Sequence, residues 1–137
     1  MTKRTYIDAN PLIAAWHGKD NAGLEALTIL DDPERMLLVS DALWLEVMPK
    51  AIYQKQQAEI AFYQSIFMRA EHCPWRLDVL QQAHDLAQRY GIAAMDSIHV
   101  TTALAAGADE FISGEKPTRP MFRVCDIPMI SLRGKMP

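Results

Sequence analysis

The chain has 137 residues, of which 50% are hydrophobic and 23% are charged, and its formal net charge is −3 at pH 7. This composition excludes a disordered chain and predicts a single domain over residues 1–137. Two cysteines, Cys73 and Cys125, are too few for a disulfide framework or a four-cysteine zinc site, and free thiols are typical of a reducing compartment. No apolar stretch approaches the roughly 18 residues of a spanning helix, so we expect a cytoplasmic protein without signal peptide or membrane anchor.

The first third of the chain has the pattern of a strand followed by two helices. Residues 4–8 are rich in β-branched and aromatic side chains, which predicts a strand. Asn10 and Pro11 then suit the N-cap and first turn of a short helix that ends at Gly18. A second helix is expected over residues 24–30.

The middle of the chain predicts one buried strand and two more helices. Residues 36–39 form a continuous apolar run, as in a parallel strand that is covered on both faces. Ser40 or Asp41 is expected to cap the helix that follows, and Pro49 to kink or end it because proline lacks an N–H group. A long helix around residues 60–67 comes next.

The last part of the chain predicts two helices and two strands. Residues 77–90 have the spacing of an amphipathic helix, which Gly91 ends, and a further helix is expected over residues 96–106. Residues 110–113 and 128–130 read as short strands. Strands joined by helical crossovers indicate an α/β fold, in which a parallel sheet of about four strands has helices on both faces.

Four carboxylates fall beside the ends of the predicted strands. Asp8 ends the first strand, and Glu46 lies within two turns of the start of the helix after the second. Asp96 opens the helix before the third strand, and Glu115 lies just past that strand. Since ligands of open α/β sheets bind beyond the carboxyl ends of the strands, these four side chains are expected to meet at one edge of the sheet.

Each acid also has a purely structural interpretation. Asp8 can cap its helix, Asp96 can favour a helix N-terminus, Glu46 can be solvated, and Glu115 can pair with a neighbouring base. Converging carboxylates, however, repel one another unless a divalent cation lies between them. Ligands with oxygen atoms alone select Mg²⁺ or Mn²⁺, which activate water and neutralise a phosphoryl group.

Basic residues are concentrated after Glu115, where the only acid is Asp126 and the bases are Lys116, Arg119, Arg123, Arg133 and Lys135. Such a segment can contact phosphate, so we name Lys116, Arg119 and Arg123 as candidate nucleic-acid contacts. The alternative is a solvated, loop-rich tail.

Other chemistries have little support in the sequence. The glycines form no phosphate-binding loop, and Ser113 and Ser131 lack the context of a nucleophile elbow. No HExxH pattern is present, and we interpret His84 and His99 as helix-face residues rather than ligands.

Four motifs in order resemble the PIN-domain family, and within it the VapC-like toxins of bacterial toxin–antitoxin modules: TYIDAN at 5–10, LEV at 45–47, MDSIHV at 95–100 and FISGEK at 111–116. The resemblance implies a three-layer α/β sandwich and a metal-dependent endoribonuclease that leaves 5′-phosphate and 3′-hydroxyl ends. By motif position it assigns one or two Mg²⁺ or Mn²⁺ ions to Asp8, Glu46 and Asp96. Glu115 stands as a fourth ligand where the family more often has aspartate, and Asn10 and Ser113 support the site.

Our first functional hypothesis is therefore a metal-dependent ribonuclease that acts on RNA and is held by a cognate antitoxin. The second is a PIN-like module with weak or absent catalysis that binds RNA or a protein partner. A phosphoacceptor domain built on Asp8 is excluded, because a paired acid and a suitably placed lysine are missing. The aromatic side chains of the middle helices also predict a homodimer; they are Trp44, Tyr53, Phe62, Tyr63 and Phe67.

Overall fold

The computed structural model describes residues 2–133, and Lys135 of the basic segment lies outside them. The fold is built on one sheet of five parallel strands in the order β3-β2-β1-β4-β5. The strands are β1 (Lys3–Ile7), β2 (Arg35–Ser40), β3 (Glu71–Cys73), β4 (Glu110–Ser113) and β5 (Met129–Ser131). Strand β1 lies at the centre, and the chain builds outward from it first on one side and then on the other.

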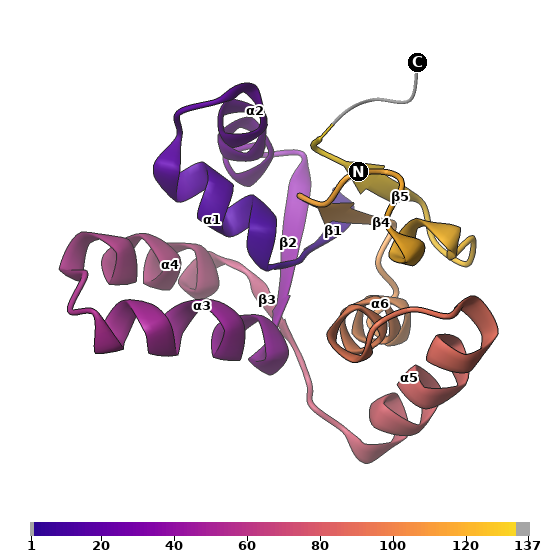
Figure 1. The fold of residues 1–137 in the computed structure, drawn as a ribbon. Coiled ribbons are helices and arrows are strands. Elements are labelled where there is room, and N and C mark those ends of the chain that lie inside the picture. The colour runs from indigo at the N-terminus through magenta and orange to yellow at the C-terminus, as the bar shows by residue number, and fades with distance from the viewer. Residues whose placement is uncertain (1, 134–137) are drawn as a thin grey trace.

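Helices cover both faces of this sheet. They are α1 (Ala9–His17), α2 (Asn21–Leu30), α3 (Asp41–Tyr53), α4 (Gln57–Arg69), α5 (Leu77–Tyr90), α6 (Ala94–Ala105) and the 3₁₀ helix Pro120–Arg123. Figure 1 shows α1 to α4 on one side of the sheet and α5 and α6 on the other. Among residues 2–133, no helix combines the length and the apolar character that crossing a membrane requires.

Alternating side chains of the strands produce two separate cores. Ile7 of β1 and its neighbour Ile112 of β4 belong to the core beneath α1 to α4. Tyr6 and its neighbour Phe111 belong to the core beneath α5 and α6, where their rings stack at 5.3 Å. All four are fully buried, which confirms the prediction of a parallel sheet that is covered on both faces.

The sheet has one strand more than the sequence predicts. Strand β3 pairs with β2 in parallel, and Glu71 lies opposite Leu38. Its sequence, Glu-His-Cys, contains no β-branched residue, and two of its three residues are exposed. The backbone of β2 therefore determines this edge strand, and the local sequence carries no signal for it.

The predicted N-cap at Asn10 is wrong, and Pro49, which was expected to kink or end its helix, does not end it. The first helix begins at Ala9 with Asp8 in the N-cap position, two residues before the predicted cap at Asn10. Helix α3 continues through Pro49 to Tyr53. Because Met48 and Ala51 on either side of the proline are buried in the core, packing offsets the loss of one backbone hydrogen bond.

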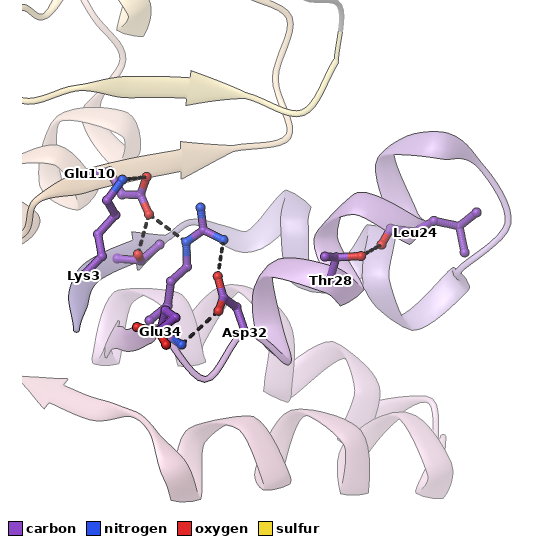
Figure 2. A network of polar contacts seen from close by, with 8 residues as sticks. Lys3, Leu24, Thr28, Asp32, Glu34 and Glu110 are labelled. Atoms are coloured by element: carbon purple, nitrogen blue, oxygen red, sulfur yellow. Dashed lines mark hydrogen bonds and ion pairs between the residues drawn. The ribbon is translucent and has the colours of Figure 1, made fainter. Parts of the chain in front are cut away.

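Hydrogen bonds and ion pairs connect the amino-terminal parts of the three central strands (Figure 2). Glu110 of β4 is 2% exposed, and its Oε2 accepts hydrogen bonds from Thr5 Oγ1 at 2.6 Å and Arg35 Nε at 2.9 Å. Lys3 Nζ lies 3.7 Å from Oε1, and Arg35 also pairs with Asp32 at 3.0 Å. Since the strands are parallel, this cluster lies at the opposite edge of the sheet from the carboxyl ends.

Candidate metal centre

The carboxyl ends of β1 and β4 form the switch point of the sheet, because the chain crosses from one half of the sheet to the other between these two strands. A polar pocket of about 100 Å³ opens there. All four sequence-predicted carboxylates line it, and its wall consists of Asp8, Ala9, Asn10, Glu46, Asp96, His99 and Glu115.

Asp8 directly follows β1 and is 6% exposed. It occupies the N-cap position of α1, but its side chain makes no capping hydrogen bond, so capping does not explain this residue. Its Oδ1 is buried and has no hydrogen-bond partner among the described residues. Burial raises the pKa of Asp8 from 3.8 to about 6, and although Ser113 and His99 oppose that shift, Asp96 and Glu46 add to it.

Glu46 lies on the second turn of α3 with its side chain one-third exposed. Its Oε1 makes a short contact with Nε2 of His99, which is almost completely buried on α6. The Nδ1 atom of His99 lies 2.7 Å from the Tyr6 hydroxyl, which in turn lies 2.7 Å from Ser40 Oγ. Glu46 is therefore connected through hydrogen bonds to buried residues of the core.

Asp96 is the third residue of α6 and is partly buried. Burial raises the pKa of its carboxyl, the positive charge of Arg119 opposes this shift, and Glu115 adds to it. A first-turn acid is also favoured by the helix dipole, so its position alone does not distinguish a ligand from a structural acid.

Glu115 follows β4 by two residues and has partners within the site. Its Oε1 accepts a hydrogen bond from Asn10 Nδ2 at 2.7 Å, and its Oε2 lies 3.7 Å from Arg119 Nε. Ser113 accepts a hydrogen bond from the Glu115 backbone at 3.0 Å and so shapes this loop. Gly114 lets the loop approach α1, because a Cβ atom there would lie 2.6 Å from Asn10 Cβ.

The candidate nucleic-acid contacts separate in space. Arg119 lies beside Glu115 at the site, whereas Arg123 donates a hydrogen bond to the Tyr90 carbonyl at the end of α5. Lys116 is exposed one residue after Glu115. In residues 2–133, no three His, Cys, Asp or Glu side chains lie close enough together to hold one ion. The carboxylates therefore border the same pocket without forming a compact set of ligands.

Residues 5–118 match the family model of the PIN domain. The chain belongs to the PIN-domain family. The match spans most of the chain and includes all four carboxylates of the pocket, which confirms the resemblance that the sequence motifs indicated.

Three solved structures contain chains with the same fold. VapBC2 from Rickettsia felis bound to promoter DNA matches with a TM-score of 0.71 at 13% identity, over 93% of this chain and 98% of that one. VapBC-1 from nontypeable Haemophilus influenzae matches with a TM-score of 0.70 at 16% identity, over 96% of this chain and 99% of that one. A toxin–antitoxin complex from Klebsiella pneumoniae matches with a TM-score of 0.67 at 20% identity, over 93% of this chain and 97% of that one. Comparison with curated protein sequences gave no significant match.

Two residues of the site were missed by sequence reasoning. His99 was interpreted as a helix-face residue, yet it lines the pocket and contacts Glu46. Tyr6 was assigned only to a strand. A signal for His99 was present, because Asp96 and His99 are spaced i, i+3 and such residues share one helix face. No comparable signal joined Tyr6 to a residue so distant in the sequence.

The raised pKa of Asp8 predicts that this carboxyl contributes more to the stability of the metal-free protein in weak acid than at neutral pH. An acid whose pKa is higher in the folded than in the unfolded state stabilises fully below its unfolded pKa, and this contribution is lost as pH rises through about 6. We expect Asp8 to add about 1 kcal/mol to the free energy of unfolding in chelator at pH 5 relative to pH 7.

Urea unfolding of wild type and Asp8→Asn in chelator across this range measures the effect. The difference between the two curves reports Asp8 together with its electrostatic coupling to Asp96, Glu46 and His99. A difference that does not change between pH 5 and pH 7 would contradict the prediction.

Proposed function

We propose that this protein is a Mg²⁺- or Mn²⁺-dependent endoribonuclease and the toxin of a toxin–antitoxin pair. The main support is that carboxylates from four separate parts of the chain border one small polar pocket. One of them, Asp8, has a buried oxygen without a partner among the described residues. A buried carboxylate oxygen that lacks a hydrogen-bond partner is costly, and a divalent cation would satisfy it.

The donor set fits a hard cation, because every candidate ligand is a carboxylate oxygen. Asp8, Glu46, Asp96 and Glu115 would hold the ion, which on binding supplies an activated water and neutralises the phosphoryl group of RNA. Asn10 and Arg119 orient Glu115. Arg119, an exposed cation at the edge of this pocket, is placed to attract the phosphate backbone of RNA toward the site.

Cleavage of a panel of end-labelled RNAs tests this function. We expect cleavage with Mn²⁺ or Mg²⁺, none with chelator, and products with 5′-phosphate and 3′-hydroxyl ends. If no RNA is cut in either metal, the nuclease proposal is wrong.

The alternative is a PIN-like module that binds RNA or a protein partner with little or no catalysis. The observation that favours it is the engagement of Glu115 by Asn10 and Arg119, which lowers its availability to an ion. Binding of RNA with an affinity that does not change when chelator replaces Mn²⁺, together with absent cleavage, would support this alternative.

We also propose an antitoxin as the protein partner, since the similar solved structures are of VapBC and toxin–antitoxin complexes. Induction of this chain alone in a bacterial host is expected to arrest growth. Co-expression of a short neighbouring reading frame should restore growth, and the two products should purify as a complex.

A homodimer is the expected assembly. Tyr63 and Phe67 are buried within the monomer, so these two predicted interface aromatics belong to its core. Helix α3 nevertheless exposes Leu45, Ile52 and Tyr53 at 67%, 53% and 87%. An exposed apolar face of this kind is typical of protein interfaces.

Light scattering at micromolar concentration is expected to give twice the monomer mass. The double substitution Leu45→Glu and Ile52→Glu should reduce the mass to that of a monomer. Leu77→Glu, which changes an apolar residue that is 71% exposed on α5, on the other side of the sheet from α3, serves as the control and should leave the dimer intact. A wild-type monomer would contradict the prediction.

A further inference from the structure

A hydrogen-bonded network of buried polar groups connects the core of the protein to Glu46. The Leu43 backbone N–H donates to Ser40 Oγ at 3.2 Å, and Ser40 Oγ lies 2.7 Å from the Tyr6 hydroxyl. That hydroxyl lies 2.7 Å from His99 Nδ1, and His99 Nε2 contacts Glu46 Oε1. Ser40, Tyr6 and His99 are each at most 2% exposed.

Only one direction of donation gives every hydroxyl in this network an acceptor. Ser40 donates to Tyr6, Tyr6 donates to His99 Nδ1, and the proton on His99 Nε2 points to the Glu46 carboxylate. In the reverse direction the Ser40 hydroxyl would have no acceptor among the described residues, and a neutral His99 would turn a lone pair toward a carboxylate. The burial of Tyr6 raises the pKa of its phenol, so this group keeps its proton and can donate.

The hydrogen-bonded network is anchored on the two adjacent strands β1 and β2 of the sheet. Tyr6 belongs to the central strand β1, and Ser40 ends β2 and caps α3, the helix that bears Glu46. The Glu46 side chain itself is one-third exposed at the pocket. Its Oε2 has no hydrogen-bond or ion-pair partner among residues 2–133, so His99 holds one oxygen of the carboxylate and leaves the other available.

We propose that His99 is a positioning residue, which holds Oε1 of Glu46 through its Nε2–H group and thereby directs the other oxygen, Oε2, to the cation. Tyr6 and Ser40 fix the ring of His99 in the orientation that this requires. The inference rests on the proposed function, since it names how one ligand of that same site is oriented. Hydrogen bonds to ligating carboxylates typically change metal affinity or activity by 10- to 100-fold.

Two substitutions at His99 separate its two contacts. The amide nitrogen of His99→Gln takes the place of Nε2, so it keeps a donor for Glu46 and loses the contact with Tyr6. The amide of His99→Asn takes the place of Nδ1, so it keeps a partner for Tyr6 and leaves Glu46 without one. The side chain of His99→Asn is one methylene shorter than that of His99→Gln, so the double-mutant cycle with Glu46→Gln is needed to separate the lost donor from the lost volume.

Calorimetric titration of the metal-free protein with Mn²⁺ is the primary measurement. We expect His99→Asn to weaken Mn²⁺ binding by about 10- to 100-fold, and His99→Gln to stay within about threefold of wild type. The control is Thr102→Val, which removes a partly buried hydrogen bond to the Ile98 carbonyl on the same helix and should leave Mn²⁺ affinity unchanged. Equal losses in the two His99 variants would show that the donor to Glu46 does not determine Mn²⁺ affinity, and would overturn the proposal.

A double-mutant cycle with Glu46→Gln tests whether His99 acts through Glu46. If it does, His99→Asn lowers Mn²⁺ affinity in the wild-type background and adds little in the Glu46→Gln background. Additive losses in both backgrounds would instead mean that His99 acts on the site by another route, such as the placement of Asp96 on the same helix.

The tautomer of His99 gives a readout that needs neither metal nor RNA. Nitrogen-15 NMR in chelator should show the ring proton on Nε2, and the resonance should shift in Glu46→Gln. A proton on Nδ1 would overturn the inference. If the wild type cuts RNA with Mn²⁺ while the His99 results go against expectation, the positioning role alone is wrong. If the wild type neither binds Mn²⁺ nor cuts RNA, the proposed function and the positioning role are both wrong.

Discussion

Replacing Asp96 with asparagine is expected to lower RNA cleavage in Mn²⁺ by about a hundredfold or more while the fold survives. The substitution keeps the shape of the side chain and removes one negative charge from a pocket that is bordered by three other carboxylates. If Asp96 binds the ion, Mn²⁺ affinity falls in the same variant. Cleavage of a labelled RNA and calorimetric titration with Mn²⁺ measure the two effects.

The change in stability that Asp96→Asn causes in chelator distinguishes the two roles of Asp96 by its sign. Burial and the nearby carboxylates raise the pKa of Asp96, so removing its charge should raise the melting temperature of the metal-free protein. If Asp96 serves only the helix dipole, the variant should instead lose about 0.3–1 kcal/mol and keep any activity. Unchanged cleavage would remove Asp96 from the catalytic set and with it most of the case for a nuclease.

Asp78 offers a matched control, because it is a first-turn acid of α5 that is 55% exposed and pairs with Arg76 at 3.2 Å. The variant Asp78→Asn removes the same charge from an equivalent helix position outside the pocket. We expect it to cost about 0.3–1 kcal/mol and to leave cleavage at the wild-type rate. A loss of cleavage in this control would mean that the assay reports helix stability rather than chemistry.

Replacing Glu110 with alanine is expected to lower the free energy of unfolding by about 3 kcal/mol, which corresponds to roughly 10 °C in melting temperature. Glu110 is 2% exposed and satisfies Thr5 Oγ1 and Arg35 Nε at the amino ends of β1 and β2 (Figure 2). Its removal leaves those donors without their acceptor and opens a cavity between the strands. The Arg35 side chain is 21% exposed, so water limits the loss.

The matched control for Glu110 is Glu71→Ala. Glu71 also pairs with an arginine, at 2.7–2.8 Å from Arg4, but the two side chains are 45% and 33% exposed. Exposed pairs contribute about 0–1 kcal/mol, so this variant should melt close to wild type. Neither variant should change the Mn²⁺-dependent rate per folded molecule, because both sites are remote from the pocket. Equal melting temperatures for the two variants would refute the prediction for Glu110.

The fold class and the four carboxylates that border the pocket could be predicted from the sequence. Buried strands such as residues 36–39 carry their signal in their own composition, and helix ends such as Gly91 carry it in one residue. Asp8 and Glu115 were predictable because parallel strands end at one edge of the sheet, so residues after two strands must lie near each other. These inferences need only local pattern and chain direction.

The hydrogen-bond partners of those carboxylates could not be predicted from the sequence and depend on how distant elements pack together. His99 and Glu46 are 53 residues apart and Tyr6 and His99 are 93 apart, so no local pattern relates them. Strand β3 and the passage of α3 through Pro49 were decided in the same way, by a neighbouring strand and by the packing of Met48. Hydrogen-bond partners depend on which faces of distant elements meet, and that is fixed by the packing of the whole core rather than by any one segment.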